Sequence, residues 1–104
     1  MNILLVCAAG MSTSLVVAKM KKFLKPEEAD WVISAIPSEE LAQQVDKYDV
    51  VLLGPQLKFK KEILEEITAP KGIPLEVINM MDYGTMRGDK ILEFAKMLYN
   101  NKNR

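Results

Sequence analysis

The sequence contains no histidine and only one cysteine, Cys7, among its 104 residues. Without histidine, the chain cannot carry a phosphoryl group on an imidazole, and catalysis by a Cys/His or Ser/His pair is excluded. The nitrogen and sulfur ligands that transition metals prefer are almost missing, so we expect no metal site and assign no cofactor.

The sequence also lacks an excess of charge and a long apolar run. Fourteen basic residues balance fourteen acidic ones, and no basic run is interleaved with aromatic residues, which argues against a nucleic-acid partner. No apolar stretch approaches the roughly 20 residues that cross a bilayer, and the first residues do not resemble a signal peptide. We expect a cytoplasmic protein without direct membrane insertion, in which the reducing environment keeps the single thiol free.

Cys7 lies between a predicted buried strand and the first predicted helix. Residues 3–6 are all apolar, as expected for a strand that is covered on both faces of a parallel sheet. The small and hydroxyl-bearing residues that follow allow a tight turn into a helix that begins near residue 11. Backbone N–H groups at a helix N-terminus bind anions, and their field stabilises a thiolate. The pattern predicts a nucleophilic Cys7 inside a phosphate-binding loop formed by Ala8, Ala9, Gly10, Met11, Ser12, Thr13 and Ser14.

Each part of this pattern also has a simpler structural interpretation. A lone cysteine is by default a small buried apolar side chain. The hydroxyls of Ser12, Thr13 and Ser14 are ordinary N-cap groups, a role that is compatible with phosphate binding. The coincidence of the cysteine, the glycine-containing turn and three hydroxyl residues favours the phosphate-binding interpretation.

Alternating strand and helix patterns predict an α/β fold. Strands are expected at residues 3–6, 31–36, 50–53 and 75–78, each followed by a helix or an irregular segment that leads to one. The first and third are wholly apolar and belong inside the sheet, whereas Ser34 and Glu76 mark the other two as edge strands. We predict a four-stranded parallel sheet of order 2-1-3-4 with helices on both faces. This is a three-layer, flavodoxin-like or low-molecular-weight phosphatase-like architecture, in one domain over residues 1–104.

Helical periodicity predicts which side chains face the sheet. The first helix should run to about residue 24 and bury Val16, Val17, Met20, Phe23 and Leu24. The short helix after Ser38 should bury Leu41, Ala42 and Val45. The helix over about residues 58–67 should bury Phe59, Ile63, Leu64 and Ile67. The last helix, from Asp89 to about residue 100, should bury Ile91, Leu92, Ala95, Leu98 and Tyr99.

Two later segments should emerge beside Cys7, because the carboxyl ends of parallel strands share one edge of the sheet. Residues 54–56 (GPQ) end the third strand, and the irregular residues 79–88 follow the fourth. Exposed methionines suit an adaptable docking surface, although filling of core gaps is an equal alternative for Met80, Met81 and Met86. We expect partner contacts at Met11, Pro55, Gln56 and Tyr83.

Residues 7–14 (CAAGMSTS), 49–56 (DVVLLGPQ), 72–78 (GIPLEVI) and 82–84 (DYG) together resemble one protein family. It is the lactose/cellobiose-type enzyme IIB component of the bacterial phosphoenolpyruvate-dependent sugar phosphotransferase system, and the resemblance spans nearly the whole chain. It implies a phosphotransferase in which Cys7 accepts phosphate from a phosphohistidine of a IIA partner. The phosphocysteine then passes the group to a sugar held by a membrane IIC partner. Cellobiose, chitobiose, lactose and other β-glucosides all stay open as the sugar.

Two other functions are alternatives. Low-molecular-weight protein tyrosine phosphatases and similar arsenate reductases place a nucleophilic cysteine after strand 1, in a Cys-x5-Arg-Ser motif. Here Thr13 stands at the arginine position, whereas Ser14 matches. Loss of the bidentate arginine clamp on the phosphoryl oxygens favours a carrier over a hydrolase. The other alternative is a protein-binding module or a flavodoxin-like cofactor domain. For the carrier, we expect a monomer with small, transient partner contacts.

Overall fold

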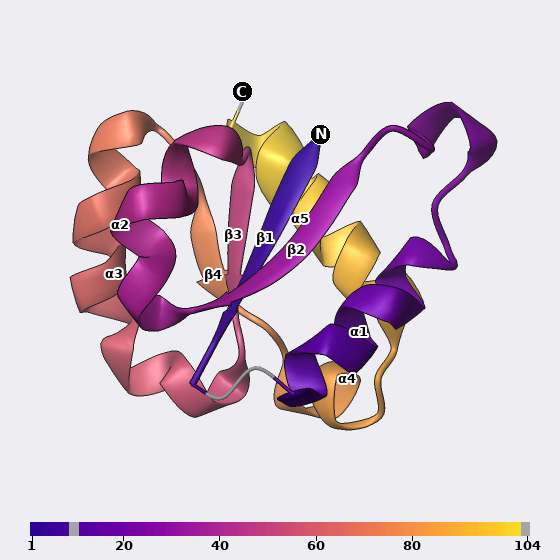
Figure 1. Cartoon of the computed structure of the whole chain (residues 1–104), viewed down its shortest axis with the longest axis horizontal. Helices are drawn as coiled ribbons and strands as arrows, with labels where there is room; N and C mark the ends of the chain where they lie inside the picture. The colour runs from indigo at the N-terminus through magenta and orange to yellow at the C-terminus, as the bar shows by residue number, and fades with distance from the viewer. Residues whose placement is uncertain (9–10, 103–104) are drawn as a thin grey trace.

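The computed structural model describes residues 1–8 and 11–102, apart from the side chains of residues 11–13 and 102. Its strands are β1 (Asn2–Cys7), β2 (Val32–Pro37), β3 (Val50–Leu53) and β4 (Leu75–Val77). All neighbouring pairs are parallel, and the strands lie side by side in the order β2-β1-β3-β4 (Figure 1). The predicted sheet, with its two wholly apolar strands inside, is confirmed.

Helices cover both faces of this sheet. The α-helices are α1 (Met11–Lys21), α2 (Leu41–Gln44), α3 (Lys61–Thr68), α4 (Met80–Gly84) and α5 (Gly88–Lys102). Short 3-10 helices are η1 (Pro26–Glu28), η2 (Ser38–Glu40), η3 (Val45–Lys47), η4 (Pro55–Lys60) and η5 (Ala69–Lys71). Helices α2 and α3 lie on one face, and α1, α4 and α5 lie on the other (Figure 1). Within the described residues, no helix has the length and apolar character that a membrane span requires.

The first strand is buried on both faces of the sheet. Ile3, Leu4, Leu5 and Val6 are all completely buried. Ile3 and Leu5 belong to the core under α1 and α5, whereas Leu4 and Val6 belong to the core under α2 and α3. Burial of each such side chain is worth about 1.5 to 3 kcal/mol, so this strand contributes to both halves of the core.

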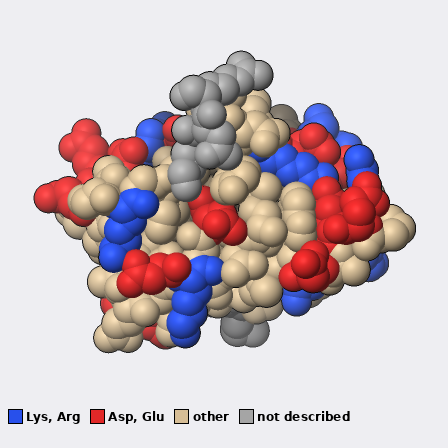
Figure 2. Space-filling model, turned by 90° about the horizontal axis from the view of Figure 1, so that it is seen from above, with Lys and Arg blue, Asp and Glu red and all other residues tan. Residues whose placement is uncertain are grey.

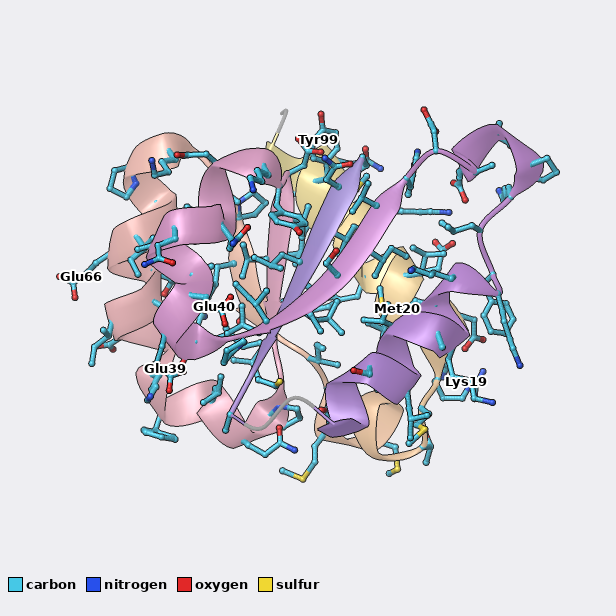
Figure 3. The ribbon with its side chains drawn as sticks, in the orientation of Figure 1. Lys19, Met20, Glu39, Glu40, Glu66 and Tyr99 are labelled. Carbon is cyan, nitrogen blue, oxygen red and sulfur yellow. The ribbon has the colours of Figure 1, made fainter. Side chains whose placement is uncertain are left out.

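The first helix is shorter than its pattern predicts. Val16, Val17 and Met20 are buried as expected, while Lys19 of the same helix projects away from the sheet (Figure 3). After Lys21 the chain tightens, because the N–H of Phe23 donates to the carbonyl of Met20, three residues back, at 3.0 Å. A hydrogen bond to the third preceding residue, instead of the fourth, changes the angle between successive side chains around the helix axis. The prediction for Phe23 is therefore wrong, since that side chain is 52% exposed, whereas Leu24 still packs partly against the core.

The segment after β3 departs further from the prediction. Residues 55–60 form the 3-10 helix η4, and α3 begins only at residue 61. A 3-10 helix has three residues per turn, so one α-helical pattern cannot continue through it. Leu64 is buried and Ile67 half-buried as predicted, but Phe59 and Ile63 are 77% and 64% exposed. Ala42 is also exposed, because α2 is a single turn between two 3-10 helices.

The outer strand β4 is short and charged. It has three residues, and its central residue Glu76 forms an ion pair with Lys61 of α3, with 2.9 Å between Oε1 and Nζ. Charges and short length are features that discourage an edge strand from pairing with another chain. The face that carries the chain termini shows acidic and basic side chains interspersed, without one dominant sign (Figure 2).

A buried ion pair attaches the connection between α1 and β2 to helix α5. Glu28 is 8% exposed, and its Oε2 lies 2.8 Å from Nζ of Lys96. The Lys25 backbone N–H donates to Oε1 of Glu28 at 2.9 Å, and Lys96 also lies 5.4 Å from the centre of the Trp31 ring. The Lys25 N–H, followed by the Lys96 ammonium, lowers the pKa of Glu28 from its usual 4.5.

This lowered pKa predicts an acid-dependent loss of stability. Because the carboxylate is favoured in the folded state, its stabilisation is complete above pH 4.5 and is lost as pH falls through the folded pKa. We expect Glu28→Gln to be less stable than the wild type near neutral pH and to lose less on acidification, as measured by urea unfolding across that range. Glu27→Gln changes an exposed neighbour and should have the same dependence of unfolding free energy on pH as the wild type. If the free energy of unfolding changed with pH in the same way for the wild type and Glu28→Gln, the stabilising role of the Glu28 carboxylate would be contradicted.

Gly88 predicts a second stability effect, because it permits α5 to approach α1 closely. A Cβ atom at Gly88 would clash with the carbonyl group of Lys19 and lie 2.6 Å from its oxygen. The obstacle is backbone, so Gly88→Ala should push the helices apart and lower the free energy of unfolding by about 1 to 3 kcal/mol. Gly84→Ala is the control, because nothing lies within 4 Å of its Cβ position. Equal urea midpoints for the two variants would show that this contact has no energetic role.

Candidate functional site

Cys7 is the last residue of β1, and its side chain is covered. It lies in register with Pro37 of β2, and the residue is 2% exposed. Its thiol contacts the Ile36 carbonyl as a weak donor, with 4.0 Å between Sγ and the oxygen. The cysteine therefore lies at the carboxyl edge of the sheet, as predicted, but beneath the surface of that edge.

The predicted phosphate-binding loop leads from Cys7 into α1. Ala8 is exposed, and the predicted roles of Ala9 and Gly10 fall outside the described residues. The backbone of Met11, Ser12 and Thr13 forms the first turn of α1, but their side chains, including the partner contact predicted for Met11, are not described. Ser14 is in the same helix and is exposed. The first turn contains no acidic residue, so no carboxylate of its own competes for the free N–H groups and positive partial charge of a helix N-terminus.

The turn after β3 lies directly beside this strand end. Gly54 is buried, and its N–H donates to the Val6 carbonyl at 2.9 Å, which continues the pairing of β1 with β3. A Cβ atom on Gly54 would lie 2.7 Å from Oε1 of Gln56 and 3.8 Å from Cε1 of Tyr83. Gln56 and Tyr83 therefore both pack around Gly54, next to the last residues of β1.

An apolar pocket of about 470 Å³ opens at this edge of the sheet. It is lined by Pro55, Gln56, Met80, Tyr83, Gly84 and Met86. Three of the four predicted contact residues thus lie around one hollow. Tyr83 is the most buried of these three, at 8% exposure.

Helix α4 carries much of the pocket, although the sequence predicted an irregular segment there. The Asn79 side chain caps this helix by accepting hydrogen bonds from the N–H groups of Met81 and Asp82, at 2.8 and 3.1 Å. Asparagine is a strong N-cap residue, and this was the signal that could have identified α4. Met80 and Met81 are 75% and 73% exposed, so neither fills a core gap, whereas Met86 packs partly against the core.

Acidic side chains follow β2 at the same edge of the sheet. Glu39 and Glu40 lie in η2, which begins one residue after the Pro37 that pairs with Cys7 (Figure 3). The backbone N–H of Glu39 itself and then the Ser38 hydroxyl, which is 3.2 Å from Oε1, lower the pKa of Glu39. The site therefore has a carboxylate on its β2 side and an apolar pocket on its β3 and β4 side.

The family model for the lactose/cellobiose-specific IIB subunit of the phosphotransferase system matches residues 2–94. The chain belongs to this family. The resemblance inferred from the sequence motifs is confirmed, and the family's IIB components are phosphotransferases of sugar uptake that normally work with IIA and IIC components.

Relatives of this IIB protein are similar over almost their whole length. The galactose-specific EIIB component of Lactococcus lactis subsp. cremoris is 44% identical over 103 residues, covering 94% of this chain and 95% of the relative. The oligo-beta-mannoside-specific EIIB component of Bacillus subtilis is 40% identical over 101 residues, covering 97% and 98%. The solution structure of the cellobiose-specific phosphotransferase IIB component from Borrelia burgdorferi has a TM-score of 0.80 and 55% identity, covering 98% and 94%. These relatives are named for three different sugars.

The covered position of Cys7 predicts slow reaction with external reagents. We expect the native IIB protein to react with iodoacetamide more slowly than the urea-unfolded chain, by at least about an order of magnitude, because the thiol must first be exposed by a local opening. Mass spectrometry of samples quenched over time measures both rates. Equal rates would show that the thiol is freely accessible in the folded protein.

Proposed function

We propose that Cys7 carries a phosphoryl group between a IIA protein and a sugar bound by a membrane IIC protein. The observation that carries this proposal is the place of the only cysteine, at the end of a central strand and four residues before an α-helix begins. In the first step the N–P bond of a phosphohistidine breaks and an S–P bond forms on Cys7. In the second step the S–P bond breaks and an O–P bond forms on the sugar. The sugar hydroxyl gives its proton to a base of the partner that holds the sugar.

The backbone around α1 suits such an intermediate. N–H groups from Ala8 to Thr13 hold the phosphoryl oxygens, and the hydroxyls of Ser12 and Thr13 add further donors. The Ser14 hydroxyl hydrogen-bonds the sulfur of Cys7. Phosphate is favoured at a helix N-terminus by free N–H groups and by the helix dipole. The absence of an acidic residue from the first turn supports this role, because no carboxylate within that turn opposes the phosphoryl charge.

The carrier function is favoured over hydrolysis by the residue at position 13. A phosphatase loop of the Cys-x5-Arg-Ser type uses its arginine to stabilise charge on the transferring group, and such cations are worth several orders of magnitude in rate. Thr13 has no such charge. A carrier benefits from this, since partners supply the stabilising groups during each transfer and water does not remove the phosphoryl group between transfers.

The remaining parts of the proposal concern access and partners. Because Cys7 is 2% exposed, its sulfur must become accessible to the phosphohistidine when IIA docks. The pocket edge formed by Pro55, Gln56 and Tyr83, together with Met11, provides the docking contacts. The protein works in the cytoplasm as a monomer that binds IIA and IIC in turn, and we assign the choice of sugar to IIC.

Phosphorylation of Cys7 tests this function directly. The protein is incubated with phosphoenolpyruvate, the general relay proteins and a IIA protein, and the intact mass and the modified residue are then measured. We expect one phosphoryl group on Cys7, dependent on IIA, and none on Cys7→Ser. The unfolding curve of Cys7→Ser is the control for folding.

Two results would overturn the carrier function. One is stoichiometric phosphate on Cys7→Ser, because the group would then be held elsewhere. The other is sustained turnover of an aryl phosphate by the protein alone, which would favour the phosphatase alternative over a single phosphorylation event.

A further inference from the structure

The side chain of Gln56 is folded back towards the strand end that carries Cys7. Its Oε1 lies 2.7 Å from the position of a Cβ on Gly54, and that position is 3.6 Å from the Val6 carbonyl. Only glycine leaves room for this arrangement without a shift of the glutamine. The conformation therefore depends on a residue that is paired with the strand of the cysteine.

The backbone of the turn that carries Gln56 is held at a fixed place. Leu53 pairs with Val6, and Gly54 donates to the Val6 carbonyl, so Gly54 lies beside Cys7 at the next step along the two strands. Neighbouring strands are about 4.8 Å apart. The Leu57 N–H donates to the Gly54 carbonyl at 2.9 Å and the Leu57 side chain is buried, which fixes the turn on both sides of Gln56.

The amide of Gln56 is available for a ligand. Gln56 is exposed, and within residues 1–8 and 11–102 its amide makes no hydrogen bond. A carboxamide has two N–H donors and no charge. The chain therefore presents a neutral donor on the turn beside the strand end that carries Cys7, on the side opposite to the acidic residues that follow β2.

We propose that Gln56 is a phosphoryl-binding residue, whose Nε2–H donates a hydrogen bond to an oxygen of the phosphoryl group on Cys7. This inference rests on the proposed function and adds one side-chain donor to the backbone N–H groups that hold the phosphoryl oxygens. The phosphoryl oxygens are charged in both transfers, so a donor on a neighbouring strand holds the group in line for the incoming partner. A neutral donor supplies part of what the missing arginine would give, without adding a permanent positive charge.

Three variants test this role in the transfer assay with phosphorylated IIA. Gln56→Met keeps the length of the side chain and removes both donors, and we expect it to slow phosphorylation of Cys7 by about tenfold, the value of one hydrogen bond to a charged group. Gly54→Ala keeps the glutamine but displaces it, and should also slow the transfer. Gln43→Met, at an exposed glutamine of α2, is the matched control and should react at the wild-type rate.

A spectroscopic measurement separates binding from a merely structural effect. In ¹H–¹⁵N spectra, the side-chain amide protons of Gln56 should shift downfield when Cys7 becomes phosphorylated. If the wild type carries phosphate on Cys7 but this amide does not shift, or if Gln56→Met reacts at the wild-type rate, the role of Gln56 is overturned and the carrier function stands. If the wild type takes no phosphate on Cys7, both are overturned.

Discussion

Complete burial of β1 on both faces is the constraint on which the rest of the structure depends. Its alternating side chains fill two separate cores, so the strand cannot move along its axis or shift register without exposing one of them. Parallel pairing with β2 and β3 then fixes which residues lie beside its last position. The place of Cys7, the turn at Gly54 and the start of α1 are consequences of this one buried strand.

The same constraint explains why much of the fold was predictable. A strand covered on both faces must be apolar throughout, and residues 3–6 and 50–53 are the two runs of that kind in the sheet. Two inner strands and two mixed ones leave few arrangements that obey right-handed crossovers. The position of the site follows from the same reasoning, because the ends of β1, β3 and β4 must share one edge. Pro55, Gln56 and Tyr83 could thus be grouped from the sequence alone.

The errors arise where helices change type. Phe59 matches an α-helical pattern, but η4 has a shorter period and turns it towards solvent. Phe23 is misplaced for a similar reason at the end of α1. Ile63 lies in α3, whose buried positions are Leu64 and Thr68. Pairing between distant residues was also missed, because nothing near Glu28 in the sequence indicates that Lys96 will reach it. The identity of the sugar has no signal in the sequence, since relatives at 40% identity or more are named for three different sugars.

The short, charged outer strand β4 has a consequence for strand addition at this edge of the sheet. Unpaired backbone N–H and C=O groups on an edge strand can form hydrogen bonds with the extended backbone of another chain. Strand β4 has only three residues, so few such hydrogen bonds can form. The charged pair Glu76–Lys61 further discourages strand pairing there. A strand added at β4 would therefore form only a short ladder of backbone hydrogen bonds.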